Sequence, residues 1–240
     1  MAEQEVIKHT KKVYKIWGSE KHNFWEKLRE FLVEIVIIVF AVSLSIWLHE
    51  RSEHSHQQQE VKAFLFGLRE DLKNDIKEMG EDKKSFYANR GGFGYLANLR
   101  LNETINRDSV LKYKQFLRNT TSLLANNGRF EGFKSSGRIG NIEDLDLQND
   151  IMEFYTENLP SLLLSTNLYT QQKLKFMDVV SENLVRLTDS TTNEDKVLVM
   201  PRVYNHIVTL SNVKEIIDRY DTCINKAKKI MGRIDNRYGR

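Results

Sequence analysis

Residues 31–48 are apolar almost throughout, and this stretch constrains the reading of the whole chain more than any other. It reads FLVEIVIIVFAVSLSIWL, with Glu34 as its single charged residue and no proline or glycine. A helix needs roughly 17 to 25 apolar residues to cross a bilayer. Trp25 and Trp47 flank the stretch at positions where aromatic rings favour the membrane–water interface. The sequence therefore predicts one transmembrane helix. The alternative, a buried helix of a soluble protein, usually has a shorter apolar run.

Composition predicts a single helical domain beyond this stretch. Roughly 190 residues follow Leu48, which is enough to bury one core, and the mean hydropathy of the chain, −0.50, is that of a soluble protein. Two prolines and 12 glycines in 240 residues favour long helices. The net charge is only +3 and the basic residues are dispersed, which argues against a nucleic-acid-binding protein. Cys223 is the single cysteine, so no intramolecular disulfide can form.

Basic residues are concentrated before the apolar stretch. They are Lys8, Lys11, Lys12, Lys15, Lys21, Lys27 and Arg29, against Arg51, Lys62 and Arg69 in the following segment. Because the side richer in Lys and Arg stays in the cytoplasm, we expect a cytoplasmic N-terminus and a periplasmic C-terminal part. A cleavable signal peptide would need small residues near the end of the apolar segment. Residues 47–50 are Trp-Leu-His-Glu, so an uncleaved anchor is expected.

These observations predict an all-α chain: one N-terminal transmembrane helix continues into a stalk and then into an extracytoplasmic helical bundle. Residues 1–30 read either as a short helix lying on the inner leaflet, with Ser19 as a candidate cap of the following helix, or as a disordered tail. The expected segments are a basic cytoplasmic segment, 1–30; the transmembrane helix, 31–48; a juxtamembrane stalk helix, 49–88; and the periplasmic helical bundle, 89–240.

Two groups of polar residues near the membrane are candidate sites. Glu34, Ala41 and Ser45 share one helical stripe, which suggests a helix–helix contact, although Glu34 lies near enough to the cytoplasmic end to reach the headgroups. His49, Glu53 and His56 also share a stripe, and this spacing can bind zinc or sense pH. Their alternative is an ordinary solvated juxtamembrane helix. No cofactor is predicted from the sequence.

Apolar spacing and turn residues outline the remaining helices. A helical pattern begins at Glu60, and Gly91–Gly94 is expected to form a turn that ends it. A second helix is expected from Asp108 or Ser109, and Asp144 or Asp146 is expected to cap a later one. Pro160 is expected at a break or in a first helical turn. A single final helix is expected after Pro201, followed by a solvated basic tail of Arg233, Arg237 and Arg240.

Lys134-Ser135-Ser136-Gly137 is the most distinctive motif outside the membrane stretch. A lysine can activate a serine nucleophile, but the lysine must be buried and neutral. Neighbouring helical residues also point about 100° apart, so Lys134 is poorly placed to serve Ser135. A helix stop explains the motif better, with the serine hydroxyls bonded to local backbone and Gly137 in the left-handed conformation. We therefore expect a rigid corner between two helices.

The chain resembles an uncharacterised family of single-pass membrane proteins common in Bacteroidota. Glu34 to Leu72, and the Phe133–Gly137 segment followed by Leu147 to Tyr155, carry this resemblance over roughly a third of the chain. The family usually has Gly where this chain has Val33, and Asn-rich residues around the tryptophan that this chain has as Trp47. The resemblance implies topology and fold, because the family has no established activity.

Three functions are compatible with the sequence. We expect a non-enzymatic interaction or scaffold protein of the inner membrane, with the lipid bilayer and a second copy or another membrane or periplasmic protein as partners. The first alternative is a periplasmic sensor or small-ligand-binding helical domain, since a bundle can hold a ligand between its helices. The second is a membrane-anchored hydrolase, for which the six histidines offer no recognisable motif.

Overall fold

The computed structural model describes residues 24–99, 105–189 and 191–239. It divides into an N-terminal unit, Met1–Glu60, and a C-terminal unit, Val61–Arg240. The inner-leaflet helix or tail expected before residue 24, and the Ser19 cap, lie outside the described residues. Every regular element in the described ranges is a helix, which confirms the all-α prediction. A single β-bridge joins Arg186 and Thr192.

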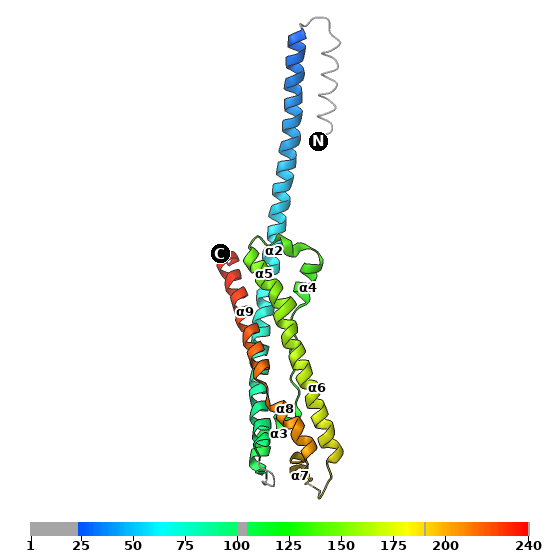
Figure 1. Ribbon diagram of the computed structural model, residues 1–240. Coiled ribbons are helices and arrows are strands. Elements are labelled where there is room, and N and C mark those ends of the chain that lie inside the picture. Colours follow the sequence, from blue (N-terminus) through cyan, green and yellow to red (C-terminus); the bar gives the residue numbers. More distant parts are fainter. Residues whose placement is uncertain (1–23, 100–104, 190, 240) are drawn as a thin grey trace. The chain divides into compact units, whose positions relative to one another are not determined.

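The elements follow the chain in one order, labelled as in Figure 1. They are α2 (Phe24–Ala97), α3 (Arg107–Arg118), α4 (Gly128–Ser135), the short 3-10 helix η1 (Arg138–Asn141), α5 (Leu145–Glu153), the π-helical turn η2 (Phe154–Asn158), α6 (Leu159–Asn183), α7 (Glu194–Leu198), α8 (Pro201–Ser211) and α9 (Lys214–Tyr238).

Within the N-terminal unit, the described residues belong to α2. Its apolar side chains between residues 32 and 48 are exposed around the helix, with Phe40 at 66% and Val36 at 65%. Among the described helices, α2 is the one that is long and apolar enough to cross a membrane. An aqueous surface this apolar is unfavourable, and a lipid environment removes the cost.

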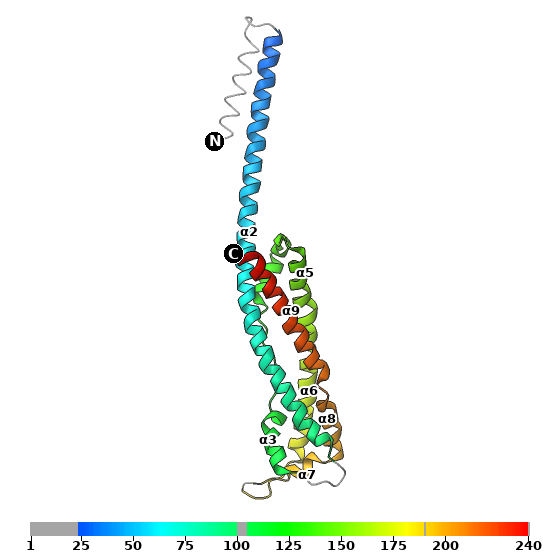
Figure 2. The same cartoon turned by 90° about the vertical axis from the view of Figure 1, so that its left-hand side faces the viewer.

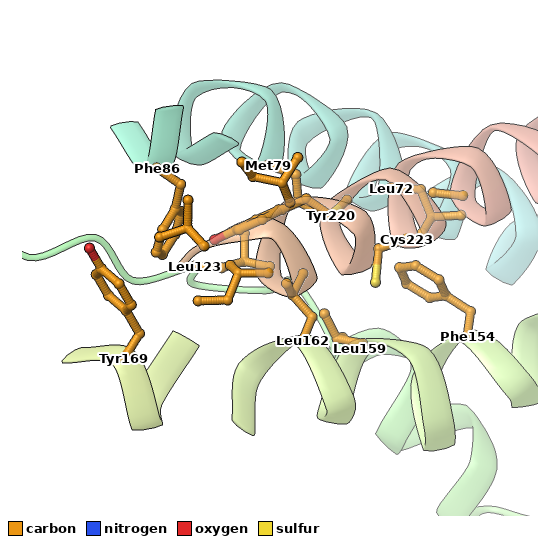
Figure 3. Packing of buried hydrophobic residues seen from close by; sticks show 14 of the residues in the cluster. Leu72, Met79, Phe86, Leu123, Phe154, Leu159, Leu162, Tyr169, Tyr220 and Cys223 are labelled. Carbon is orange, nitrogen blue, oxygen red and sulfur yellow. The ribbon is translucent and has the colours of Figure 1, made fainter. Parts of the chain in front are cut away.

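The C-terminal unit is a bundle in which α2, α6 and α9 run alongside one another (Figures 1 and 2). Side chains from all three helices point into a common core, together with Phe154 of η2 and Leu123 of the segment before α4 (Figure 3). Phe86 of α2 lies edge-on to Tyr169 of α6, with ring centroids 5.2 Å apart, and 5.7 Å from the ring of Tyr220 of α9. These rings provide large apolar areas for burial.

The part of α2 that enters this core begins at Val61, earlier than the start of the predicted bundle. Val61, Leu65 and Leu68 are fully buried, and the buried pattern continues to Leu96. Residues 61–88, expected as stalk, therefore pack as part of the C-terminal unit. The helical spacing read from the sequence between Val61 and Met79 is confirmed.

The turn expected at Gly91–Gly94 is wrong, because α2 continues as a helix to Ala97. The glycines serve a packing role instead. A Cβ at Gly92 would lie 2.9 Å from the Cβ of Tyr113, and one at Gly91 would lie 3.1 Å from its ring. Because glycine lacks a side chain, Tyr113 of α3 can lie directly on the α2 backbone.

Two helix breaks have clear causes. The π-turn η2 lies just before Pro160, where the proline ring would clash with the preceding turn of a regular helix. The single helix expected after Pro201 is wrong: α8 ends at Ser211 and α9 begins at Lys214. The break leaves the carbonyl of Leu210 open, and the Tyr169 hydroxyl donates a hydrogen bond to it at 3.1 Å.

Candidate functional site

Three polar side chains occupy core positions of α2 at a spacing of seven residues. Inward-facing residues of α2 alternate every four and three positions from Val61 to Leu96, and Asp75, Asp82 and Asn89 fall on this stripe. Asp75 and Asn89 are buried and Asp82 is half-buried. We call these three residues the polar row. Such spacing keeps them on one side of a helix that packs at near-heptad periodicity.

Each member of the polar row has a partner on a different part of the bundle. Oδ1 of Asp75 accepts hydrogen bonds from the backbone N–H and the side-chain amide of Asn126, at 3.1 and 2.7 Å. Oδ2 of Asp82 accepts from the hydroxyl of Tyr220 on α9 at 3.0 Å. Oδ1 of Asn89 accepts from the amine of Lys173 on α6 at 2.9 Å. A buried polar contact at a defined position sets the register of packed helices.

The polar row also supports a buried segment that has no regular structure. Residues 119–127 connect α3 to α4, and their backbone groups lack the hydrogen bonds of a helix. Lys173 donates to the carbonyl of Asn119, Glu78 accepts from the N–H of Leu124 at 2.9 Å, and Asp75 accepts from Asn126. Side chains of α2 and α6 thus replace the missing backbone partners.

Burial perturbs the ionisation of these groups. It raises the pKa of Asp75, although the hydrogen bonds from Asn126 oppose the shift. It raises the pKa of Asp82 as well. It lowers the pKa of Lys173 to about 8, and the ammonium lies 5.8 Å from the centroid of the Phe93 ring. A lysine with a lowered pKa is a candidate base or nucleophile, but Lys173 is only 1% exposed and holds the bundle together.

The Lys-Ser-Ser-Gly motif forms the end of α4. The hydroxyls of Ser135 and Ser136 donate to the carbonyls of Gly132 and Phe133, at 3.1 and 2.8 Å, and Gly137 has a φ of +75°. These contacts confirm the expected helix stop. Lys134 is exposed, so it lacks the burial that a serine-activating lysine needs.

Two ring stacks attach this corner to the bundle. Phe130 stacks on Tyr155 of η2, with ring centroids 4.4 Å apart, and Phe133 stacks on Phe64 of α2 at 3.8 Å. The hydroxyl of Tyr155 and Oδ2 of Asp75 are both buried, and neither has a hydrogen-bond partner in the described part of the chain. Burial, followed by the charge of Asp75, raises the pKa of Tyr155.

A second electrostatic cluster joins α5 to α9. Asp150 is buried, and its carboxylate lies 2.8 Å from the amine of Lys226, 3.0 Å from that of Lys229 and 3.2 Å from Nε of Arg233. Burial alone would raise the pKa of Asp150, but the hydrogen bonds from the two lysines outweigh it and hold the pKa below its usual value. Asp144 caps α5 by accepting from the N–H of Leu147 at 3.0 Å, as expected.

The basic tail was expected to be solvated, and for its described arginines this is wrong. Arg233 lies 3.3 Å from Asp146, and Arg237 lies 3.6 Å from Glu143. Arg240 lies outside the described residues. The acidic partners come earlier in the sequence by about 90 positions, so helix periodicity alone gave no indication of them.

The predicted residues of the N-terminal unit remain separate from these clusters. Ser45 donates to the carbonyl of Ala41 at 2.8 Å, and Glu34 is buried. His49 pairs with Glu53 at 3.8 Å, and His56 lies on the same exposed stretch. Among the described residues, no three His, Cys, Asp or Glu side chains come together in a way that could hold a metal ion.

Comparisons with protein-family models, with curated proteins and with solved structures found no match to this chain. The resemblance to the Bacteroidota membrane-protein family therefore stays a prediction from the residues that carry it. Sequence reasoning missed the polar row and Lys173. The available signal was a polar residue falling on an otherwise apolar stripe.

Proposed function

We propose that the chain is a non-enzymatic interaction or scaffold protein of the bacterial inner membrane, anchored by residues 31–48. The exposed apolar surface of α2 carries this proposal, since a bilayer is the environment that covers it on all sides. The excess of lysines before residue 31 supports a cytoplasmic N-terminus and a periplasmic C-terminal unit.

A scaffold role is supported by how the polar groups of the C-terminal unit are used. The polar row bonds to partners inside the bundle, the serines of the Lys-Ser-Ser-Gly motif bond to backbone, and Asp150 pairs with three cations. These contacts hold elements together in a fixed arrangement. Partners would be the lipid bilayer and, through the stripe of Glu34, Ala41 and Ser45, a second copy of the chain or another inner-membrane or periplasmic protein.

Topology and assembly can be tested on the full-length protein. We expect it to stay in the membrane pellet after carbonate extraction, and a C-terminal phosphatase that works only in the periplasm to be active. Light scattering in detergent should give a protein mass above the 28.2 kDa of one chain. Release by carbonate, or a phosphatase that is inactive although the fusion is produced, would contradict the anchor and its orientation. A mass of one chain would contradict self-association.

A further inference from the structure

The C-terminal unit contains a cavity that neither the core nor the polar row uses. It has a volume of about 220 Å³ and is lined by residues of α3, of the end of α6 and of α7. The apolar part of the lining consists of Leu117, Phe176, Met177, Val180, Leu184 and Leu198. A cavity of roughly 150 Å³ lined by such side chains binds benzene, so this one takes an apolar group of about eight carbon atoms.

Two opposite charges lie together on the same lining. Nη2 of Arg118 on α3 is 2.5 Å from Oε1 of Glu194 on α7. The Arg118 side chain is half exposed and that of Glu194 is 17% exposed, so solvent reaches the pair from one side. The cavity therefore offers an apolar interior next to one cation and one anion. Pockets of this kind bind ligands through apolar burial and a few placed polar groups.

From this arrangement we propose that the cavity binds a free α-amino acid with a large apolar side chain, such as phenylalanine or leucine. The side chain fills the apolar interior. The carboxylate binds the guanidinium of Arg118, which presents paired donors to such a group, and the ammonium binds Glu194. This binding site goes beyond the scaffold function, and it is independent of whether the chain self-associates.

The charge arrangement selects a zwitterion over a simple acid or amine. A carboxylic acid that took Arg118 would separate it from Glu194 and leave that carboxylate without its cation. An amine would leave Arg118 without its anion in the same way. Leaving one member of a partly buried pair without its partner is unfavourable. A ligand that carries both charges on one carbon gives each residue a new partner.

The full-length protein in detergent can be titrated by calorimetry with five probes. These are phenylalanine, leucine, 3-phenylpropionate, 2-phenylethylamine and alanine. We expect the first two to bind, and the other three to bind at least about tenfold more weakly because each lacks one of the three recognised groups. Failure of both phenylalanine and leucine to bind would overturn the proposal. Equal binding of 3-phenylpropionate or 2-phenylethylamine would overturn it as well.

Variants test the location of the site. Arg118→Gln and Glu194→Gln should each weaken phenylalanine binding by about tenfold or more, and Val180→Trp should abolish it by filling the cavity. Lys175→Gln, on an exposed position of α6 that does not line the cavity, is the matched control and should bind as the wild type does. Circular dichroism checks that each variant is folded. Unchanged binding by folded Val180→Trp would place the ligand elsewhere and overturn the proposal.

Discussion

The buried amine of Lys173 on α6 donates a hydrogen bond to Oδ1 of Asn89 on α2, at 2.9 Å. This contact places an ionisable group inside an apolar bundle and joins two helices that are 84 residues apart in the sequence. The consequence is a defined dependence of stability on pH.

Lys173 should destabilise the folded protein when it is charged. Its pKa is lowered by burial from 10.5 to about 8, so between these values the unfolded state binds more protons than the folded state. Stability from this group therefore rises as pH increases from 8 to 10.5, by about 3 kcal/mol in total. We expect the free energy of unfolding of wild type, minus that of Lys173→Met, to increase by this amount between pH 7 and 10.5.

Urea unfolding of the full-length protein in detergent, followed by circular dichroism, measures this difference. The buried tyrosines titrate in both proteins and cancel in the subtraction. Lys175→Met, at an exposed position on the same helix, should show no such trend. A flat difference for Lys173→Met would contradict a lowered pKa.

Asp150→Asn should weaken the contact between α5 and α9. The substitution removes the anion that Lys226, Lys229 and Arg233 share in a largely buried position, and we expect a loss of about 3 kcal/mol. Asp146→Asn, whose side chain is exposed, should cost less than about 1 kcal/mol. Similar losses for the two variants, measured by urea unfolding, would argue against a special role for Asp150.

Acid should act on the same cluster. The pKa of Asp150 is held below its usual 3.8, so its contribution is full above pH 3.8 and is lost as pH falls through the lower folded value. In the unfolding experiment, wild type should lose more stability than Asp150→Asn as the pH is lowered below 3.8. Parallel curves for the two proteins would be inconsistent with this assignment.

Gly92 and Gly94 should respond in opposite directions to alanine. Gly92→Ala places a Cβ 2.9 Å from the Cβ of Tyr113, and we expect a loss of about 1 kcal/mol. Gly94 has no atom within 4 Å of its would-be Cβ, so Gly94→Ala should gain about 0.5 kcal/mol from helix propensity. Thermal unfolding compares the pair, with about 2 to 4 °C per kcal/mol. Equal midpoints would mean that the α2–α3 contact is loose.

The Lys-Ser-Ser-Gly motif should behave as a structural corner. Gly137→Ala forces a side chain into the left-handed conformation and should cost about 1 to 2 kcal/mol. Gly140→Ala, next to open space and without a positive φ, is the control and should be near neutral. Ser135→Ala should change the stability by less than about 0.5 kcal/mol. A large effect of Ser135→Ala with no effect of Gly137→Ala would favour a chemical role for the serine.

Cross-linking can test the membrane stripe. Ala41→Cys should form disulfide-linked dimers in oxidised membranes if this stripe mediates self-association. Val39→Cys is the control, because two residues along a helix turn the side chain by about 200°. Cys223 is buried and does not interfere. Dimers from both variants, or from neither, would contradict a contact through Glu34, Ala41 and Ser45.

Local rules were sufficient where the structure depends on neighbouring residues. Apolar spacing predicted the helices and the buried side of α2, and the left-handed glycine and the Asp144 cap followed from their own short motifs. Residues 32–48 could be recognised as a membrane-crossing candidate because bilayer thickness sets a length that sequence displays directly.

Only the tertiary structure decided which polar residues are paired. Asn89 with Lys173, Asp82 with Tyr220 and Asp150 with the cations of α9 join positions far apart in the chain. Helical periodicity describes one helix and carries no information on which neighbour it meets. The glycines at 91 and 92 show the same limit, since they are needed for the approach of Tyr113 and read alone as a turn. Packing between helices therefore fixed what the local pattern left open.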